Sequence, residues 1–474
     1  MKGRAPRHAR ATEVVPVPWS AGGAALIRVA VELEAGDTAG YLVPLTISRT
    51  ADAGGPALRV PGGSGQSPTL LVDATTDATF RAQLGAAFAV GVQLDGDGAR
   101  LLITPTPSPT PAPSRRGAPE APLGLDSRLV GAEQSNTSIV YGDRAILKLV
   151  RRLEPGVNPE LEIAHFLASL TDFRHTPELL GEMHWERAGV EPSAAGMLSR
   201  FLPGAIDGWS FALVQLRATL TQAAKAHSSG DGDVTAAMVH LGRVTRQLHE
   251  ALASHPEAPG FAVRSASTGD VATWAAATRR AADRTMVLLE TRARTLERRT
   301  EKMATALSKR RSALLDRVDE MARAAEASTR LGTVARHHGD FHLGQVLRDA
   351  TGDWKVIDFE GEPLRTLEQR RAPHSPVRDV AGMLRSFAYA AATAAAQAGG
   401  GVNAAAETCV ARWERSARES FLWGYDDGVD AASAASPELV TLFETEKLFY
   451  ELEYELNHRP DWVWIPLRGV AKLF

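Results

Sequence analysis

The sequence predicts an α+β protein with two lobes, preceded by an amino-terminal cap. Three observations lead to this prediction. Alternating apolar runs separated by turn residues fill much of the first 150 positions, a helical period begins near residue 158, and the 62 residues from Asp270 to Leu331 contain neither Gly nor Pro. We expect a cap over residues 1–124, a small β-rich lobe over 125–205 and a larger helical lobe over 206–474.

The composition is that of an ordinary folded protein. Of the 474 residues, 44% are hydrophobic and 23% are charged, and the net charge is −3, so neither extensive disorder nor a basic nucleic-acid or membrane surface is indicated. The single cysteine, Cys409, cannot form an intramolecular disulfide, which fits a reducing compartment. The sequence has no apolar run long enough for a signal peptide or a membrane span, and we therefore expect a cytoplasmic protein.

The coarse order of elements follows from local patterns. Residues 14–50 predict a small β-rich unit, and the six prolines between residues 104 and 120 predict an exposed excursion that cannot join the interior of a sheet. Residues 137–141 and 145–150, separated by Gly142 and Asp143, predict a β-hairpin. The segment 270–331 is too long for one helix of a compact domain, so we expect a bent helix or a hairpin pair.

The most informative stretch is His338-Gly-Asp-Phe-His-Leu-Gly-Gln345, followed by an apolar strand that ends in Asp358-Phe-Glu360. This is the order of parts that phosphoryl transfer needs. Asp340 would orient the acceptor hydroxyl and take its proton, while Gln345 and Asp358 supply hard oxygen ligands for Mg²⁺. The alternative is that the two aspartates only cap turns and that the histidines are structural. The combined spacing of the motif and the strand after it argues against this alternative. Zinc binding by the nearby histidines is disfavoured, because HExxH spacing is missing.

A nucleotide site should lie upstream of this motif. The polar segment Gln134-Ser135-Asn136-Thr137-Ser138 precedes the first hairpin strand and offers amides and hydroxyls in place of a glycine-rich cradle. Lys148, in the second strand, would contact the α- and β-phosphates. Its expected partner is Glu162, or Glu160, on the helix that opens near Pro159.

These segments, with Arg378 to Phe387 and Tyr450 to Pro466, resemble the maltokinases over roughly residues 125–474. The resemblance implies the bilobal, aminoglycoside-phosphotransferase-like branch of the eukaryotic protein kinase fold, and transfer of the ATP γ-phosphate to the anomeric hydroxyl of maltose. It also implies that Asp340 is the catalytic base, Gln345 and Asp358 are metal ligands assisted by Glu360, Lys148 binds phosphate and Glu162 positions it. Related glucosamine kinases, which phosphorylate the 6-hydroxyl of an amino sugar, are the second choice. The short cap around Trp19 and the long Arg- and Glu-rich segment depart from the maltokinase pattern.

The acceptor pocket is less sharply indicated. Sugar sites combine aromatic platforms with carboxylates that accept hydroxyl hydrogen bonds. The candidates of these types are Asp207, Trp209, His342, Asp426, Glu444, Tyr450, Glu451 and Trp462. Aromatic residues at helical spacing more often belong to a core than to a platform. An ammonium-bearing acceptor would need an extra carboxylate, for which Glu444 and Asp426 are equally suitable.

A different class of function stays open, in which the fold is a pseudokinase or scaffold and the Arg-rich helices bind a partner. The joint presence of Lys148, Asp340, Gln345 and Asp358 argues for an enzyme instead. We therefore expect ATP, Mg²⁺ and a small sugar as partners, with no nucleic acid and no membrane. The oligomeric state is not predicted.

Overall fold

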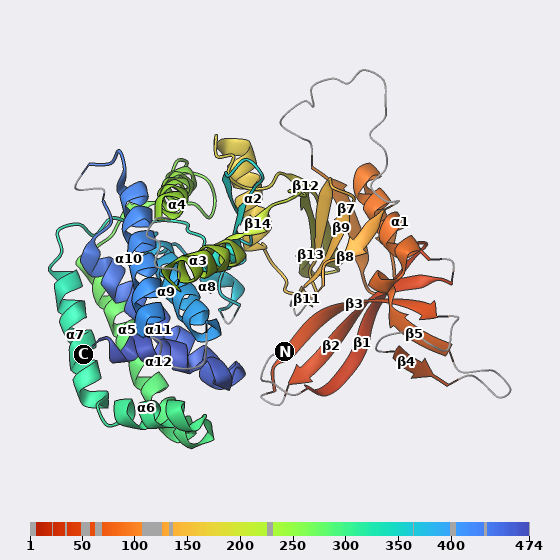
Figure 1. Ribbon diagram of the computed structural model, residues 1–474. Coiled ribbons are helices and arrows are strands. Elements are labelled where there is room, and N and C mark those ends of the chain that lie inside the picture. Colours follow the sequence, from red (N-terminus) through yellow and green to blue (C-terminus); the bar gives the residue numbers. More distant parts are fainter. Residues whose placement is uncertain are drawn as a thin grey trace. The chain divides into compact units, whose positions relative to one another are not determined.

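The computed structural model forms two compact units, described separately below (Figure 1). The first unit contains residues 3–170 and 177–204, and the second contains residues 171–176 and 205–474. The described residues are 6–20, 22–33, 36–48, 57–61, 69–106, 126–131, 136–224, 231–363, 365–398, 404–430 and 434–473. Gln134, Ser135 and most of the proline-rich excursion lie outside them.

The first unit opens with an antiparallel sheet in the order β1-β2-β3-β5-β4, with β11 also paired to β3. Its strands are β1 (Pro6–Val17), β2 (Ala24–Leu33), β3 (Thr38–Ser48), β4 (Ala57–Val60), β5 (Thr69–Asp73) and β11 (Arg152–Leu153). Alternation along these strands buries Val15, Leu26 and Leu42 on one face, where Trp19 packs edge-on against Phe80. The predicted β-rich unit over residues 14–50 is confirmed.

A second sheet of seven strands has the order β6-β7-β12-β13-β10-β9-β8. Its strands are β6 (Val92–Asp95), β7 (Arg100–Pro105), β8 (Ser127–Leu129), β9 (Thr137–Tyr141), β10 (Ala145–Leu149), β12 (Leu179–Arg187) and β13 (Val190–Arg200). The predicted hairpin is confirmed as β9 and β10, with Gly142 at a φ of 57° in the turn. The start of the proline-rich excursion was predicted wrongly, because Thr104 and Pro105 end β7 and pair with β12 inside the sheet.

Two helices accompany these sheets, α1 (Ala78–Val90) and α2 (Pro159–Leu170). The side chain of Asn158 accepts hydrogen bonds from the backbone N–H groups of Glu160 and Leu161, at 2.9 and 3.1 Å. An Asn at this position followed by Pro is a strong helix start. It fixes which residues lie in the first turn of α2.

The second unit is mainly helical (Figure 1). Its longer helices are α3 (Gly208–Ala224), α4 (Asp231–Leu252), α5 (Thr268–Arg292), α6 (Arg298–Ser308), α7 (Arg311–Glu326), α8 (Leu367–Arg371), α9 (Val377–Gln397), α10 (Ala404–Asp426), α11 (Pro437–His458) and α12 (Trp464–Ala471). Two small sheets contain β14 (Ile206–Asp207), β17 (Val346–Arg348) and β18 (Trp354–Val356), and β15 (Arg264–Ser265) and β16 (Thr333–Val334). Among the described residues, no helix is long and apolar enough to cross a membrane.

The long segment without Gly or Pro forms three helices, α5, α6 and α7, rather than one bent helix or a simple pair. Single turns around Ala293 to Leu296 and at Lys309 and Arg310 interrupt it. Leu289, Leu314 and Val318 are buried in a cluster that includes Leu452 of α11. The breaks allow the apolar stripes of all three helices to reach this cluster.

Helices α4 and α10 approach each other through a pair of glycines. A Cβ atom on Gly424 of α10 would lie 2.0 Å from the carbonyl oxygen of Val239, and one on Gly242 of α4 would lie 2.1 Å from that of Phe421. Neither backbone oxygen can move away as a flexible side chain could. The close contact therefore requires glycine at both positions.

We expect Gly424→Ala to lower the free energy of unfolding by about 1–3 kcal/mol, because overpacking against backbone outweighs the better helix propensity of Ala. Gly269→Ala in α5 is the matched control, since its Cβ would meet only the Ser267 hydroxyl at 3.6 Å. Thermal and urea unfolding of both variants check this expectation. Equal stability of the two variants would contradict the close-contact explanation.

Candidate active site

In the second unit, one face of α9 holds the loop 338–345. The carboxylate of Asp379 accepts hydrogen bonds from the backbone N–H groups of His338 and Gly339, at 2.7 and 2.9 Å. One turn later, a Cβ on Gly382 would lie 2.6 Å from the carbonyl oxygen of Phe341, and the hydroxyl of Ser386 accepts from the Leu343 N–H at 3.2 Å. The spacing of three and four residues places all three α9 contacts on one face.

The imidazole of His338 links the two aspartates of the predicted motif. Its Nδ1 accepts from the backbone N–H of Asp340 at 3.3 Å, and its Nε2–H donates to the carbonyl of Ile357 at 2.9 Å. The ring also packs against Phe341 and Phe359, with centroids 5.3 and 5.0 Å away. The backbone of Asp340 and the backbone of Ile357, the residue before Asp358, are thus hydrogen-bonded to the same side chain.

Gln345 and Asp358 are in direct contact. Gln345 Nε2 donates to Asp358 Oδ2 at 2.8 Å, and the Ile357 N–H donates to the Gln345 carbonyl at 3.0 Å. Asp358 adopts a φ of 65°, a left-handed conformation that aspartate tolerates better than most residues but that still costs free energy. Glu360 lies two residues further on, and its backbone carbonyl accepts from Arg370 at 3.4 Å.

A half-buried lysine, which the sequence analysis did not single out, contacts Asp340. Lys447 Nζ of α11 lies 2.9 Å from Asp340 Oδ1 and 3.0 Å from Glu362 Oε1, and its ammonium lies 4.6 Å from the ring centroid of Tyr450. Burial alone would lower the pKa of Lys447, but the carboxylates of Asp340 and Glu362 outweigh it and raise the pKa above its ordinary value. Lys447 is therefore a permanent cation at this site.

Glu362 connects this lysine to a wider set of charges. Its Oε2 accepts from Arg365 at 2.6 Å and from Arg378 at 3.2 Å, and Arg378 also contacts Glu446 at 3.1 Å. Burial opposes ionisation of Glu362, but Lys447 and the two arginines hold the pKa of its carboxyl well below the usual range. The carboxyl of Glu362 therefore stays ionised at neutral pH.

In the first unit, Lys148 pairs with Glu160. The Lys148 Nζ to Glu160 Oε2 distance is 2.7 Å, and Glu160 is buried while Glu162 is half-buried. The pair forms with Glu160, the second choice from the sequence, rather than with the favoured Glu162: two residues along a helix turn the side chain by about 200°, so these two glutamates of the first turn of α2 point in different directions. The helix start set by Asn158 decides between them.

The described part of the upstream polar segment interacts with Arg151. Asn136 Oδ1 accepts from the Arg151 N–H at 3.3 Å, and Thr137 Oγ1 accepts from Arg151 Nε at 2.9 Å. Ser138 lies on β9 opposite Lys148 of β10. These contacts order the start of the hairpin that carries Lys148.

Several acceptor candidates lie along one side of α11 or next to Asp340. Tyr450 and Glu451 follow Lys447 by three and four residues, and Glu451 pairs with Arg385 at 2.7 Å. His342 Nε2 lies 3.9 Å from Asp340 Oδ2, and burial lowers the pKa of this imidazole. Trp462 stacks on Tyr389 at 6.3 Å, and Trp209 lies 6.4 Å from the same ring.

The other three candidates are held by structural contacts. Asp207 caps α3 by accepting from the Ser210 N–H at 2.8 Å. Asp426 accepts from Arg246 and from the Ala435 N–H, both at 3.0 Å. Glu444 forms a two-fold pair with Arg418, at 2.7 and 2.8 Å. Each carboxylate already has partners that explain its position without a ligand.

The residues that the sequence analysis missed are Lys447, Glu362 and Asp379. Asp379 lies in the Arg378 to Phe387 segment that supported the family resemblance, but that segment had been assigned no role. Lys447 is separated from Asp340 by 107 positions. Its only sequence signal is a lone cation between the acidic and aromatic candidates of residues 444–451.

Comparisons with known proteins give related sugar kinases. No protein-family model matches the chain. The glucosamine kinase of Mycolicibacterium smegmatis is 29% identical over 350 residues, which cover 72% of this chain and 77% of that protein. The glucosamine kinase of Streptacidiphilus jiangxiensis is 27% identical over 458 residues, which cover 88% and 96% of the two chains.

The solved structures that resemble the chain give its fold. A glucosamine kinase in complex with glucosamine, ADP and inorganic phosphate has a TM-score of 0.62 and 22% identity, covering 99% of this chain and 94% of that one. A second crystal form has a TM-score of 0.63 over the same coverage. The fold is therefore a mixed helix and sheet arrangement similar to that of glucosamine kinase. Together with the curated relatives, this supports a sugar kinase family, and the chain is an enzyme of the sugar phosphotransferase class.

Proposed function

We propose that the chain transfers the γ-phosphoryl group of ATP, with Mg²⁺, to a hydroxyl of glucosamine, forming glucosamine 6-phosphate. Both curated relatives reported above carry the name glucosamine kinase, which favours this acceptor over maltose, the first choice from sequence. The solved neighbour with glucosamine and ADP supports the same pair of substrates. The name glucosamine kinase describes a catalyst, and it therefore favours an enzyme over a scaffold.

One observation carries the proposal, namely the attachment of Asp340 and of the residue before Asp358 to the single imidazole of His338. Phosphoryl transfer needs an acceptor-facing carboxylate and a metal-facing carboxylate at a fixed separation. The contacts of His338 fix the backbone near both carboxylates. The contacts of α9 fix the backbone of the loop 338–345 as well. This is the preorganisation that such a reaction requires.

Asp340 orients the acceptor hydroxyl and accepts its proton as the new phosphate ester bond forms. The bond between the γ-phosphorus and the bridging oxygen breaks, and ADP leaves with the negative charge of that oxygen. Lys447 holds Oδ1 of Asp340 at 2.9 Å, which leaves the other carboxylate oxygen for the acceptor. Lys447 is thus a positioning residue for the base.

The chemistry of Gln345, Asp358 and Glu360 fits a magnesium site. Amide and carboxylate oxygens are the ligands that Mg²⁺ prefers, and Gln345 and Asp358 are already 2.8 Å apart. A half turn of the Gln345 amide exchanges its nitrogen for its oxygen with little other movement. When bound, Mg²⁺ neutralises and aligns the β- and γ-phosphates.

Lys148 would contact the α- and β-phosphates of the nucleotide. Its pairing with the buried Glu160 fixes the position of the ammonium beside the first turn of α2. The Arg151 contacts of Asn136 and Thr137 would stabilise the preceding segment, which supplies amide and hydroxyl donors. Gln134 and Ser135 belong to the same proposed loop.

The side of α11 that carries Lys447 would also receive the amino sugar. At 1.5 Å per residue, Glu451 lies about 6 Å along the helix from Lys447, and Glu455 lies about 12 Å along it. One oxygen of Glu455, Oε2, is buried without a hydrogen-bond partner, while Oε1 accepts from Tyr389 at 2.6 Å. Carboxylates beside the Tyr389 and Trp462 rings would pair with an ammonium group and leave the rings for the sugar face.

Asp340→Asn should lower kcat by roughly 100- to 10,000-fold, because the amide keeps the shape but cannot accept the proton. Nucleotide binding, measured by calorimetry with ADP and Mg²⁺, should persist. Asp316→Asn on the exposed face of α7 is the control and should retain activity. Turnover of Asp340→Asn within a few-fold of the natural enzyme would refute the assigned role.

Lys447→Met should lower kcat by about 10- to 100-fold with little change in the KM for ATP, because it removes the ammonium that fixes Asp340. Lys447→Arg should restore part of kcat, since it keeps a cation at that position. Lys302→Met on α6 serves as the exposed control. The positioning role would be wrong if Lys447→Arg restored none of the lost kcat while both variants unfolded at the same temperature.

An acceptor panel of glucosamine, glucose, maltose and an aminoglycoside, followed by ADP release, tests the substrate. We expect kcat/KM to be highest for glucosamine. Glu455→Gln, at the carboxylate whose Oε2 has no hydrogen-bond partner, should reduce the preference for glucosamine over glucose by about 10- to 100-fold, the worth of one hydrogen bond to a charged group. Preference for maltose would reverse the choice of acceptor, and no ADP release with any sugar would favour the scaffold.

A further inference from the structure

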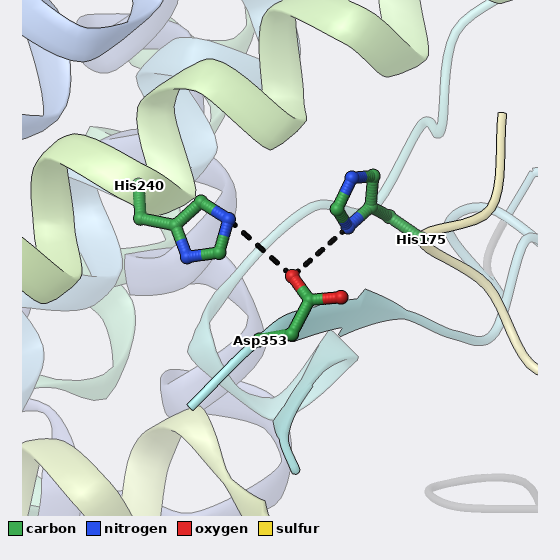
Figure 2. A group of neighbouring side chains, drawn as sticks. All are labelled: His175, His240 and Asp353. Atoms are coloured by element: carbon green, nitrogen blue, oxygen red, sulfur yellow. Dashed lines mark ion pairs between the residues drawn. The ribbon is translucent and has the colours of Figure 1, made fainter. Parts of the chain in front are cut away.

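Two histidines and one aspartate of the second unit meet outside the site described above. His175 comes from the segment 171–176, His240 from α4, and Asp353 from the turn before β18. Figure 2 shows both imidazoles directed at the same oxygen of Asp353. We call these three residues the His-His-Asp cluster.

Two of the three distances within the cluster are close to the edge length of a tetrahedral metal site. Asp353 Oδ1 lies 3.1 Å from His175 Nδ1 and 3.3 Å from His240 Nε2. All three candidate ligand atoms lie within 4.8 Å of one another. With metal–ligand bonds of about 2.0–2.1 Å, neighbouring ligand atoms of a tetrahedral zinc site are roughly 3.3–3.4 Å apart. Small side-chain rotations would therefore complete the geometry.

The ligand types select a class of ion. Two imidazoles and one carboxylate suit Zn²⁺ and similar divalent transition ions, whereas Mg²⁺ and Ca²⁺ prefer oxygen ligands alone. The side chains are 24%, 39% and 26% exposed for His175, His240 and Asp353, so water can reach the remaining coordination position.

The carboxylate is already oriented by the surrounding chain. The Trp354 N–H donates to Asp353 Oδ1 at 2.8 Å, and Lys355 Nζ donates to Asp353 Oδ2 at 2.8 Å. His175 Nδ1 also lies 3.2 Å from the Trp354 carbonyl, so this nitrogen carries a proton that an incoming ion would displace. The Lys355 ammonium opposes a cation, and we expect weaker binding than at a structural cysteine site.

We propose that His175, His240 and Asp353 bind one divalent transition ion of the zinc class, with water completing its coordination. The bound ion would join the segment 171–176 and α4 to β18. The backbone already makes one such link, since the Val356 N–H donates to the His175 carbonyl at 2.7 Å. β18 leads directly to Ile357 and Asp358, so the ion would stiffen the strand that precedes the proposed magnesium ligand.

Titration of the full-length, metal-free protein with Co²⁺ tests the proposal without an activity assay. The natural protein should develop the visible absorption of four-coordinate Co²⁺, saturating at one equivalent, and Zn²⁺ but not excess Mg²⁺ should abolish it. His240→Ala and Asp353→Asn should each weaken Co²⁺ binding at least about 10-fold. Because the readout is spectral, its result does not depend on the proposed kinase reaction.

The control is His184→Ala in the first unit, which removes an imidazole 3.4 Å from the carboxylate of Glu182. This variant should bind Co²⁺ as the natural protein does, and circular dichroism should show that all variants are folded. The proposal is overturned if the natural protein gives no such absorption, if His240→Ala binds Co²⁺ as tightly, or if His184→Ala loses the absorption.

Discussion

The buried carboxylate of Asp379 is the interaction on which the candidate site depends. It accepts hydrogen bonds from two backbone N–H groups of the loop 338–345. Its Oδ2 also lies 3.2 Å from His249 Nε2. Burial would raise the pKa of Asp379, but His337 and His249 hold that pKa below its usual range, so the group remains an acceptor at neutral pH. Removing this carboxylate would leave two buried N–H groups without partners, which is costly.

The positions of Gly382 and Ser386 follow from the same constraint. The loop runs parallel to α9, because its contacts advance along the chain together with Asp379, Gly382 and Ser386. Glycine is needed at position 382, since a Cβ there would lie 2.6 Å from the carbonyl oxygen of Phe341. The hydroxyl of Ser386 then accepts a hydrogen bond from the backbone N–H of Leu343. The helix therefore fixes the backbone of the loop, and His338 fixes its relation to Ile357.

The contact between Gln345 and Asp358 could be predicted from the sequence because the information for it is local. Asp340, Gln345 and Asp358 lie within 19 residues, and a short strand between them leaves few possible arrangements. The partner of Lys148 was harder, since the choice between Glu160 and Glu162 depends on the first residue of α2. Lys447 could not be found by pattern, because its contact with Asp340 joins distant positions through tertiary packing alone.

The charge balance around Asp340 explains why six ionisable side chains can lie together in a partly buried cluster. Lys447, Arg365 and Arg378 supply three positive charges, and Asp340, Glu362 and Glu446 supply three negative ones, with direct contacts linking all six. A neutral, fully paired network limits the desolvation cost of each member. It also leaves no surplus positive charge for a triphosphate. In the proposed reaction, Mg²⁺ and Lys148 would therefore meet the phosphate charge, and the network would hold the proposed base in place.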